Sequence, residues 1–135
     1  MRIVVDTNVL LVSVSSKSPY HCIFQSILNG TIELCVTYDI LLEYHEKIEE
    51  HMNAQTAQSV ITTLINSPFV IETVRYFYFN LITNDADDNK FIDCAIAANA
   101  VAIVTEDKDF NVLKQLDFPS LKILTIVQLK ELLEL

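Results

Sequence analysis

The sequence predicts an α/β fold of three layers, in which helices cover both faces of a mostly parallel central sheet. Short, wholly apolar runs such as residues 3–5 and 102–104 alternate with longer stretches that have helical periodicity. Such runs indicate strands that are buried on both faces, as parallel strands are. One glycine and three prolines in 135 residues provide no flexible linker, so we expect one domain over residues 1–135.

The first part of the chain is expected to form three strands and four helices. Pro19 suits the first turn of a helix, while Gly30 and Pro68 mark places where helices stop. Thr37 or Asp39 is the expected cap of the third helix. In chain order we expect a strand at 3–5, helices at 9–14 and 19–29, a strand at 33–36, helices at 40–48 and 54–66, and a strand at 69–74.

The second part is expected to continue the same alternation. A polar loop at 84–89 leads into a helix at 91–100 that is rich in small residues. A strand at 102–105, a short helix at 112–116 and a strand at 121–124 follow. Thr125 and Gln128 have the spacing of a capping box, which predicts that a C-terminal helix begins there.

Two aspartates directly follow apolar strands. Asp6 ends the run at 3–5, and Asp107 lies just beyond the run at 102–105. In parallel sheets the carboxyl ends of the strands share one edge, and ligands bind beyond that edge. We therefore expect Asp6 and Asp107 to lie at the same edge of the sheet.

Four segments, taken in order, resemble motifs of the PIN-domain nucleases. Residues 4–11 (VVDTNVLL) resemble the opening motif of that family, and residues 103–110 (IVTEDKDF) resemble its late motif. The segment Leu41-Leu42-Glu43 is similar to its helical glutamate, and residues 88–98 (DNKFIDCAIAA) are similar to the acidic start of a later helix. The resemblance covers nearly the whole chain, and the VapC-like bacterial toxins and their relatives are the branch it favours. It implies a PIN-like α/β/α fold.

The resemblance also implies a site in which carboxylates hold Mg²⁺ or Mn²⁺. Phosphodiester cleavage needs a nucleophilic water and neutralisation of developing charge, and hard cations with oxygen ligands supply both. The side chains expected to hold the metal and to be catalytic are Asp6, Glu43, Asp88, Asp93 and Asp107. Asn8 and Thr105 are expected to orient ligands, water or phosphate, and Asp109 is a further candidate oxygen donor.

The third acidic position has two candidates. Asp88 lies 19 residues before Asp107, which is close to the interval usual in the family. Asp93 instead begins a D-x-x-I-A-A string that matches the local pattern. Both would lie near the start of one helix, so both stay candidates.

Several of these residues also have ordinary structural explanations. Asp6 could simply cap a helix, and Glu43 has Lys47 four residues later, the spacing of a helical ion pair. The aromatic tract at 76–79 is typical of a core or of a subunit interface. Because the acidic residues fall in four motifs that occur in the family's order, one shared metal site is favoured over four separate structural explanations.

The expected function is that of a metal-dependent endoribonuclease that hydrolyses single-stranded RNA with an activated water. By resemblance the chain is the toxin of a toxin–antitoxin pair, a homodimer restrained by a small antitoxin. The net charge of −9 opposes tight non-specific binding of nucleic acid, although bound cations change the local field. One alternative is therefore a PIN-fold module that binds a protein and cleaves little.

A second alternative is a phosphatase or receiver-type phosphoryl domain, which also places aspartates at strand ends. Phosphatases of the haloacid dehalogenase type need D-x-D after the first strand, whereas this chain has Asn8 there.

No apolar run approaches the ~20 residues that span a bilayer, and three widely spaced cysteines predict buried thiols. We expect a cytoplasmic protein with no membrane segment.

Overall fold

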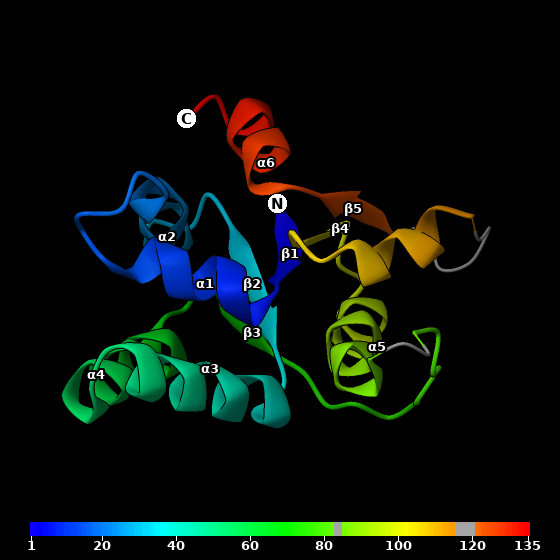
Figure 1. Ribbon diagram of the computed structural model, residues 1–135, viewed down its shortest axis with the longest axis horizontal. Coiled ribbons are helices and arrows are strands. Elements are labelled where there is room, and N and C mark those ends of the chain that lie inside the picture. The colour runs from blue at the N-terminus through cyan, green and yellow to red at the C-terminus, as the bar shows by residue number, and fades with distance from the viewer. Residues whose placement is uncertain (83–84, 116–120) are drawn as a thin grey trace.

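The centre of the fold is a parallel sheet (Figure 1). The computed structural model describes residues 1–82, 85–115 and 121–135. Over these residues the sheet has five strands in the order β3-β2-β1-β4-β5. The strands are β1 (Arg2–Val5), β2 (Glu33–Val36), β3 (Val70–Glu72), β4 (Ala102–Val104) and β5 (Lys122–Leu124).

Helices cover both faces of this sheet, which confirms the predicted three-layer α/β/α fold (Figure 1). The helices α1 to α4 lie on one face, while α5 and the 3₁₀ segment η2 lie on the other. Right-handed crossovers between parallel strands require this distribution, because the strand order reverses direction between β3 and β4. The bounds are α1 (Thr7–Val14), α2 (His21–Leu28), α3 (Tyr38–His51), α4 (Ala54–Asn66), η1 (Ala86–Asp88), α5 (Asn89–Ala97), η2 (Lys108–Gln115) and α6 (Ile126–Leu132).

The central strand β1 lies deepest in the molecule and sets the position of the site. Ile3, Val4 and Val5 are completely buried, as expected for a strand that has neighbours on both sides and helices on both faces. Ile3 pairs with Leu34 of β2 and with Ala102 of β4. The chains that leave β1 and β4 therefore emerge side by side at one edge.

Most of the predicted elements are present, with differences of a few residues at their ends. The strand expected at 69–74 is shorter, because its partner β2 ends at Val36, whose carbonyl accepts the Thr73 N–H at 2.8 Å. The predicted loop at 84–89 contains the 3₁₀ turn η1, and the following helix begins at Asn89. The capping box of Thr125 and Gln128 is present. Asn84, the first residue of the predicted loop at 84–89, and Leu116, the last residue of the predicted helix at 112–116, lie outside the described residues.

Gly30 ends α2 by a conformation that other residues rarely adopt. Its φ is +87°, and a Cβ atom there would lie 2.8 Å from the ring of Phe69.

Of the three free cysteines, Cys35 and Cys94 are buried and Cys22 is half-buried. Within the described part of the chain, no helix is both long and apolar enough to span a bilayer.

Candidate metal centre

The site begins where β1 ends, at Asp6. This aspartate caps α1, and its Oδ1 accepts a hydrogen bond of 2.8 Å from the N–H of Thr7. Its Oδ2 accepts a second bond, of 2.7 Å, from the hydroxyl of Thr105 on the adjacent β4 side. The expectation that Asp6 caps a helix is therefore correct, but capping uses only one of its two oxygens.

Asp107 reaches the same edge through the turn that follows β4. The hydroxyl of Thr105 accepts a bond of 3.0 Å from the Asp107 N–H, so one threonine connects both aspartates. Oδ1 of Asp107 in turn accepts the N–H of Asp109 at 2.9 Å. Asp6 and Asp107 thus meet at one edge, as the strand order requires.

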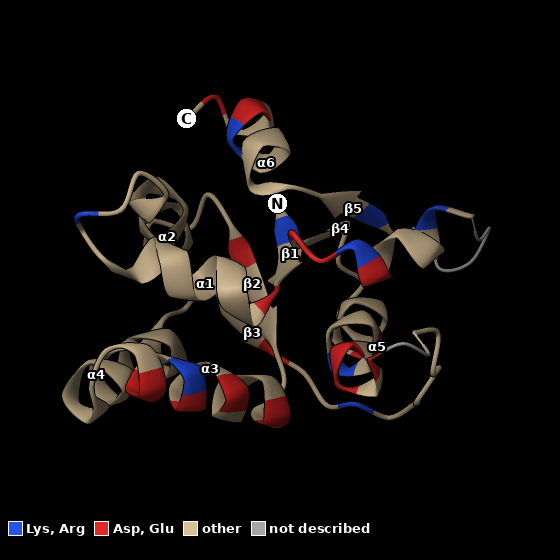
Figure 2. Ribbon diagram, in the orientation of Figure 1, with Lys and Arg blue, Asp and Glu red and all other residues tan. Residues whose placement is uncertain are grey.

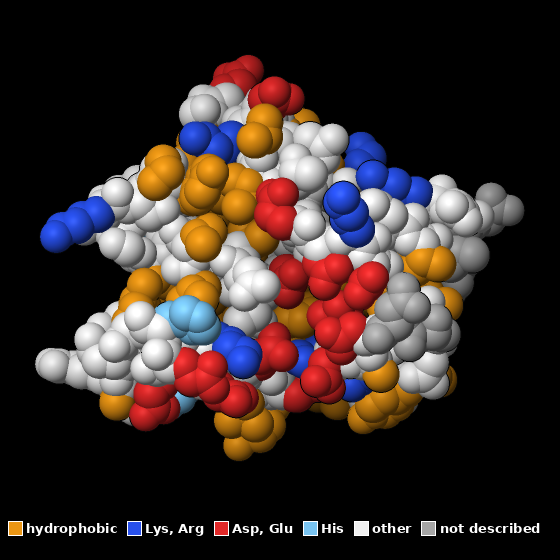
Figure 3. All heavy atoms as spheres, viewed as in Figure 1, with side chains coloured by type: hydrophobic (Ala, Val, Ile, Leu, Met, Phe, Trp, Pro, Cys, Tyr) orange, Lys and Arg blue, Asp and Glu red, His pale blue; other side chains and the backbone are white. Residues whose placement is uncertain are grey.

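Asp88 is the residue that completes an oxygen cluster with this turn. One carboxylate oxygen from each of Asp88, Asp107 and Asp109 lies within 4.8 Å of the others. Oδ2 of Asp88 is buried and has no hydrogen-bond partner among the described residues. Acidic residues also mark the segment after β1 and the start of α5 in Figure 2, and they form a patch near the middle of the face shown in Figure 3.

The cluster is electrostatically unfavourable without a cation. Burial raises the pKa of Asp88 to about 7, and the charges of Asp85, Asp6 and Asp107 add to the effect. Burial also raises the pKa of Asp6, with smaller contributions from Glu43 and Asp107. The hydrogen bonds that Asp6 accepts act in the opposite direction and favour its charged form.

Glu43 joins the site from α3, which is anchored to the end of β1. The hydroxyl of the buried Tyr44 donates to the Val5 carbonyl at 2.5 Å and so fixes this part of α3 beside the strand. The Thr7 hydroxyl donates to Oε2 of Glu43, and the Lys90 ammonium lies 2.9 Å from Oε1. Glu43 therefore contacts residues of α1 and α5.

The alternative explanation of Glu43, a helical ion pair with Lys47, is wrong. Lys47 pairs instead with Glu50 at 3.4 Å. Glu43 turns toward the site, where Lys90, only 12% exposed, neutralises it. The contact of Thr7 with Glu43 had no separate sequence signal beyond the position of Thr7 in the opening motif.

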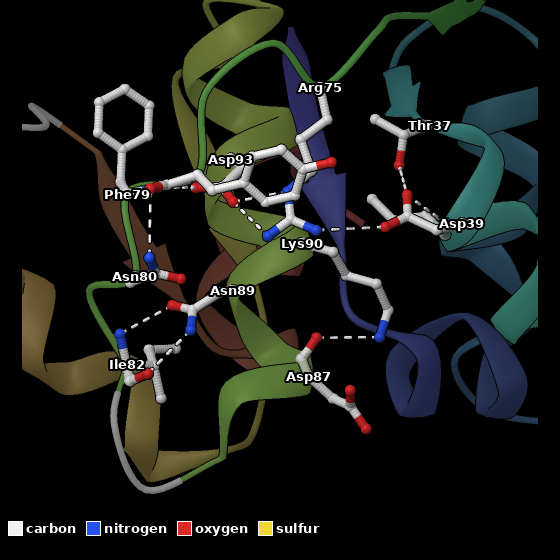
Figure 4. Close-up of polar contacts among 12 residues, drawn as sticks. Thr37, Asp39, Arg75, Phe79, Asn80, Ile82, Asp87, Asn89, Lys90 and Asp93 are labelled. Atoms are coloured by element: carbon white, nitrogen blue, oxygen red, sulfur yellow. Dashed lines mark hydrogen bonds and ion pairs between the residues drawn. The ribbon is translucent and has the colours of Figure 1, made fainter.

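Asp93 does not join the cluster. It lies five positions after Asp88, which rotates its side chain by about 140° around the helix axis. Its completely buried carboxylate lies 2.5 Å from Nη2 of Arg75 and accepts the N–H of Phe79 at 3.1 Å (Figure 4). Of the two candidates for the third acidic position, the structure places Asp88 with the cluster and engages Asp93 in an ion pair.

Asn8 is likewise separate from the carboxylates. It is exposed, and it lines a different hollow together with Tyr20 of the segment before α2 and Glu106. Thr105, by contrast, lies where an orienting residue is expected, in contact with both Asp6 and the Asp107 backbone.

A divalent cation fits the residues that are present. The donors are all carboxylate oxygens, which hard cations such as Mg²⁺ and Mn²⁺ prefer. At an effective dielectric constant of 20, two unit charges 4.8 Å apart repel by roughly 3.5 kcal/mol, and 4.8 Å is the widest spacing in the cluster. The unpartnered Asp88 oxygen and this repulsion are both relieved when a cation is bound.

The fold and the site together place the chain in a class of α/β/α proteins that gather carboxylates at one edge of a parallel sheet. Comparison with known families identifies it further: the PIN domain family matches residues 2–109. The chain therefore belongs to the PIN domain family. No curated protein sequence matches it.

Solved structures show the same fold. The crystal structure of VapBC2 from Rickettsia felis bound to a DNA fragment from their promoter contains a similar chain, with a TM-score of 0.62. The two chains are 17% identical, and the match covers 93% of this chain and 98% of that one. At this identity the likeness establishes the fold.

Proposed function

We propose that the chain is an endoribonuclease that hydrolyses single-stranded RNA with the help of Mg²⁺ or Mn²⁺. The metal would be held by Asp6, Asp88 and Asp107, with Glu43 and Asp109 as further oxygen donors. The observation that carries the proposal is the buried, unpartnered Oδ2 of Asp88 beside the oxygens of Asp107 and Asp109. Membership of a nuclease family supports the same reading.

When bound, the ion supplies neutralisation of phosphate charge and lowers the pKa of an attacking water. The protein's own residues hold the site in shape. Thr105 donates to Asp6 and accepts from the Asp107 backbone, so the two carboxylates keep a fixed relation. Thr7 and Lys90 hold the two oxygens of Glu43. Lys90 also reduces the negative charge that an incoming phosphate meets.

The proton on Asp88 makes the proposed activity depend on pH. Because its pKa is about 7 in the metal-free protein, this carboxyl is largely protonated below that pH. Metal binding requires the carboxylate, so the ion must displace a proton. Activity is expected to rise as the pH increases from 6 to 8.

A protein partner and a second copy of the chain are also part of the proposal. The similar chain of VapBC2 is part of a complex, which supports a small protein antitoxin for this chain. The net charge of −9 supports a partner with a basic surface. Sedimentation of the purified chain, alone and with a co-expressed partner, would test the homodimer and the antitoxin partner. A chain that sediments as a monomer and captures no partner would contradict both.

The nuclease proposal is tested by cleavage of an end-labelled single-stranded RNA with Mn²⁺ or with EDTA. Asp6→Asn should lower the rate by about 100-fold or more, since loss of a ligand exceeds the 10–100-fold cost of losing a supporting partner. The matched control is Glu131→Gln, which removes an exposed negative charge on α6, away from the cluster. Equal cleavage by the wild type, Asp6→Asn and the control would refute the proposal.

A further inference from the structure

Four aromatic side chains are exposed beside the metal centre. Tyr38 begins α3, directly after β2, and Tyr76, Phe77 and Tyr78 lie on the segment that follows β3. Their exposed fractions are 77%, 76%, 71% and 63% respectively. Both segments leave the carboxyl ends of neighbouring parallel strands, so they lie at the same sheet edge as Asp6.

Two of these rings line a pocket. Tyr38 and Tyr78 border a hollow of about 330 Å³ whose polar lining includes Thr37, Asp39 and Arg75. We name it the Tyr38–Tyr78 pocket. Tyr76 and Phe77 do not line it, although they are equally exposed.

The Tyr38–Tyr78 pocket continues toward the metal centre. Asp39 and Arg75 also line an adjacent hollow of about 340 Å³, whose other lining residues include Glu43 and Lys90. Glu43, itself a proposed oxygen donor, accepts a hydrogen bond from Thr7, the residue that follows Asp6. A path therefore runs from the proposed metal ligands, past Lys90 and Arg75, to the two tyrosines.

Arg75 holds this region in place. Its guanidinium binds the buried Asp93 at 2.5 Å and reaches Asp39 at 3.5 Å, so it ties the segment after β3 to both α5 and α3 (Figure 4). The same guanidinium lies 4.0 Å from the centre of the Tyr78 ring. Tyr78 is thus supported on one side by a fixed planar cation while it remains 63% exposed.

We propose that the Tyr38–Tyr78 pocket binds a base of single-stranded RNA, next to the phosphodiester that lies at the metal centre. The inference rests on the proposed function. Stacking on aromatic rings adds to the retention of single strands, and every base has a face that stacks. A chain with 9 basic and 18 acidic residues gains less from phosphate contacts than a basic chain does, so stacking is expected to contribute a larger share.

The polar groups of the pocket also favour a base over an apolar protein side chain. The Thr37 hydroxyl and Arg75 each contact the Asp39 carboxylate, whose oxygens can still accept a further hydrogen bond; the edge of a base offers donors for it, which an apolar group lacks. Asp39 has 44% of its side chain exposed, and its carboxylate can accept a hydrogen bond from an exocyclic amino group. We therefore expect cytosine to bind more tightly than uracil, which lacks that group.

Fluorescence anisotropy with short labelled oligonucleotides tests the pocket in Ca²⁺, so that binding is measured without cleavage. Oligocytidylate, oligouridylate and an abasic strand of equal length serve as probes. Tyr78→Ala and Tyr38→Ala should each weaken oligocytidylate binding by about 5- to 150-fold, the range of one lost stacking contact. Tyr76→Ala is the matched control and should bind as the wild type does. Circular dichroism checks that each variant is folded.

Equal affinity of the wild type and Tyr78→Ala, or equal affinity for oligocytidylate and the abasic strand, would overturn the proposal. So would equal losses in all three tyrosine variants. If the surface is instead a subunit interface, Tyr78→Ala will lower the sedimentation mass and leave RNA affinity unchanged, which also overturns it. Base-dependent binding by a wild type that cleaves no RNA would refute the nuclease proposal and leave the pocket intact.

Discussion

The substitution Asp88→Asn is expected to stabilise the metal-free protein while it weakens metal binding. Asparagine has nearly the same shape as aspartate and can donate to Asp107 in place of the carboxyl proton. The variant therefore removes a negative charge from the cluster at little steric cost. A metal ligand is expected to lower the stability of the metal-free chain and yet to be required for metal binding.

The size of the effect follows from the spacing of the oxygens. Two ionised carboxylates no more than 4.8 Å apart repel by roughly 3.5 kcal/mol at an effective dielectric constant of 20. Screening and relaxation reduce this, so we expect a gain in the free energy of unfolding on the order of 1–2 kcal/mol at pH 8. For a chain of this size that raises Tm by about 3–6 °C.

The gain must depend on pH in a known direction. The pKa of Asp88 is about 7 in the folded protein and 3.8 in an unfolded chain, so the folded protein binds more protons between these values. Stability of the metal-free wild type therefore falls as the pH rises through this window. At pH 5.5, inside this window, the advantage of Asp88→Asn should be smaller than at pH 8, and it should vanish only near pH 3.8, where the unfolded chain is protonated as well.

Thermal unfolding at pH 5.5 and pH 8, with EDTA and with Mn²⁺, measures these effects. Saturating Mn²⁺ at 100 times its Kd should add about 2.7 kcal/mol to the wild type and much less to Asp88→Asn. Asp87→Asn, one position earlier, is the control for loss of a surface charge. An Asp88→Asn protein that is less stable than the wild type at pH 8 in EDTA would refute the reasoning.

Three further outcomes are expected. Thr105→Val removes the hydroxyl that connects two carboxylate segments, and calorimetry should show Mn²⁺ affinity reduced by about 10–100-fold; unchanged affinity would contradict that role. Arg75→Met leaves the buried Asp93 unpaired and should cost about 3–5 kcal/mol in urea unfolding, while adding Asp93→Asn should recover part of the loss. Gly30→Ala combines an unfavourable φ with a 2.8 Å approach to Phe69, so it should cost about 1–3 kcal/mol in the same assay. A cost below 0.5 kcal/mol would mean that the turn relaxes.

The elements that the sequence predicts well are those whose pattern is local. Residues 3–5, 34–36 and 102–104 are apolar throughout, and such short runs are typical of strands that are buried on both faces. The meeting of Asp6 with Asp107 follows from parallel strands alone, because their carboxyl ends share an edge. The fold class and the shared edge of Asp6 and Asp107 could therefore be predicted from the sequence.

The parts that escaped prediction depend on contacts between distant segments. Glu43 has a lysine at the helical spacing, yet its partner is Lys90, 47 positions later in the chain. Arg75 lies in a stretch without regular structure, and only the folded chain shows that it neutralises Asp93. The local sequence pattern did not distinguish Asp88 from Asp93. The helical rotation between them places Asp88 in the cluster and Asp93 against Arg75.

The central claim is that carboxylates from distant parts of the chain hold one divalent cation at the edge of the sheet. Anomalous diffraction from crystals soaked in Mn²⁺ tests it most directly. We expect a peak bounded by oxygens of Asp6, Asp88 and Asp107 that is lost in crystals of Asp88→Asn. A peak elsewhere, or a wild-type cluster that stays without metal while Asp88→Asn and the wild type are equally stable, would contradict it.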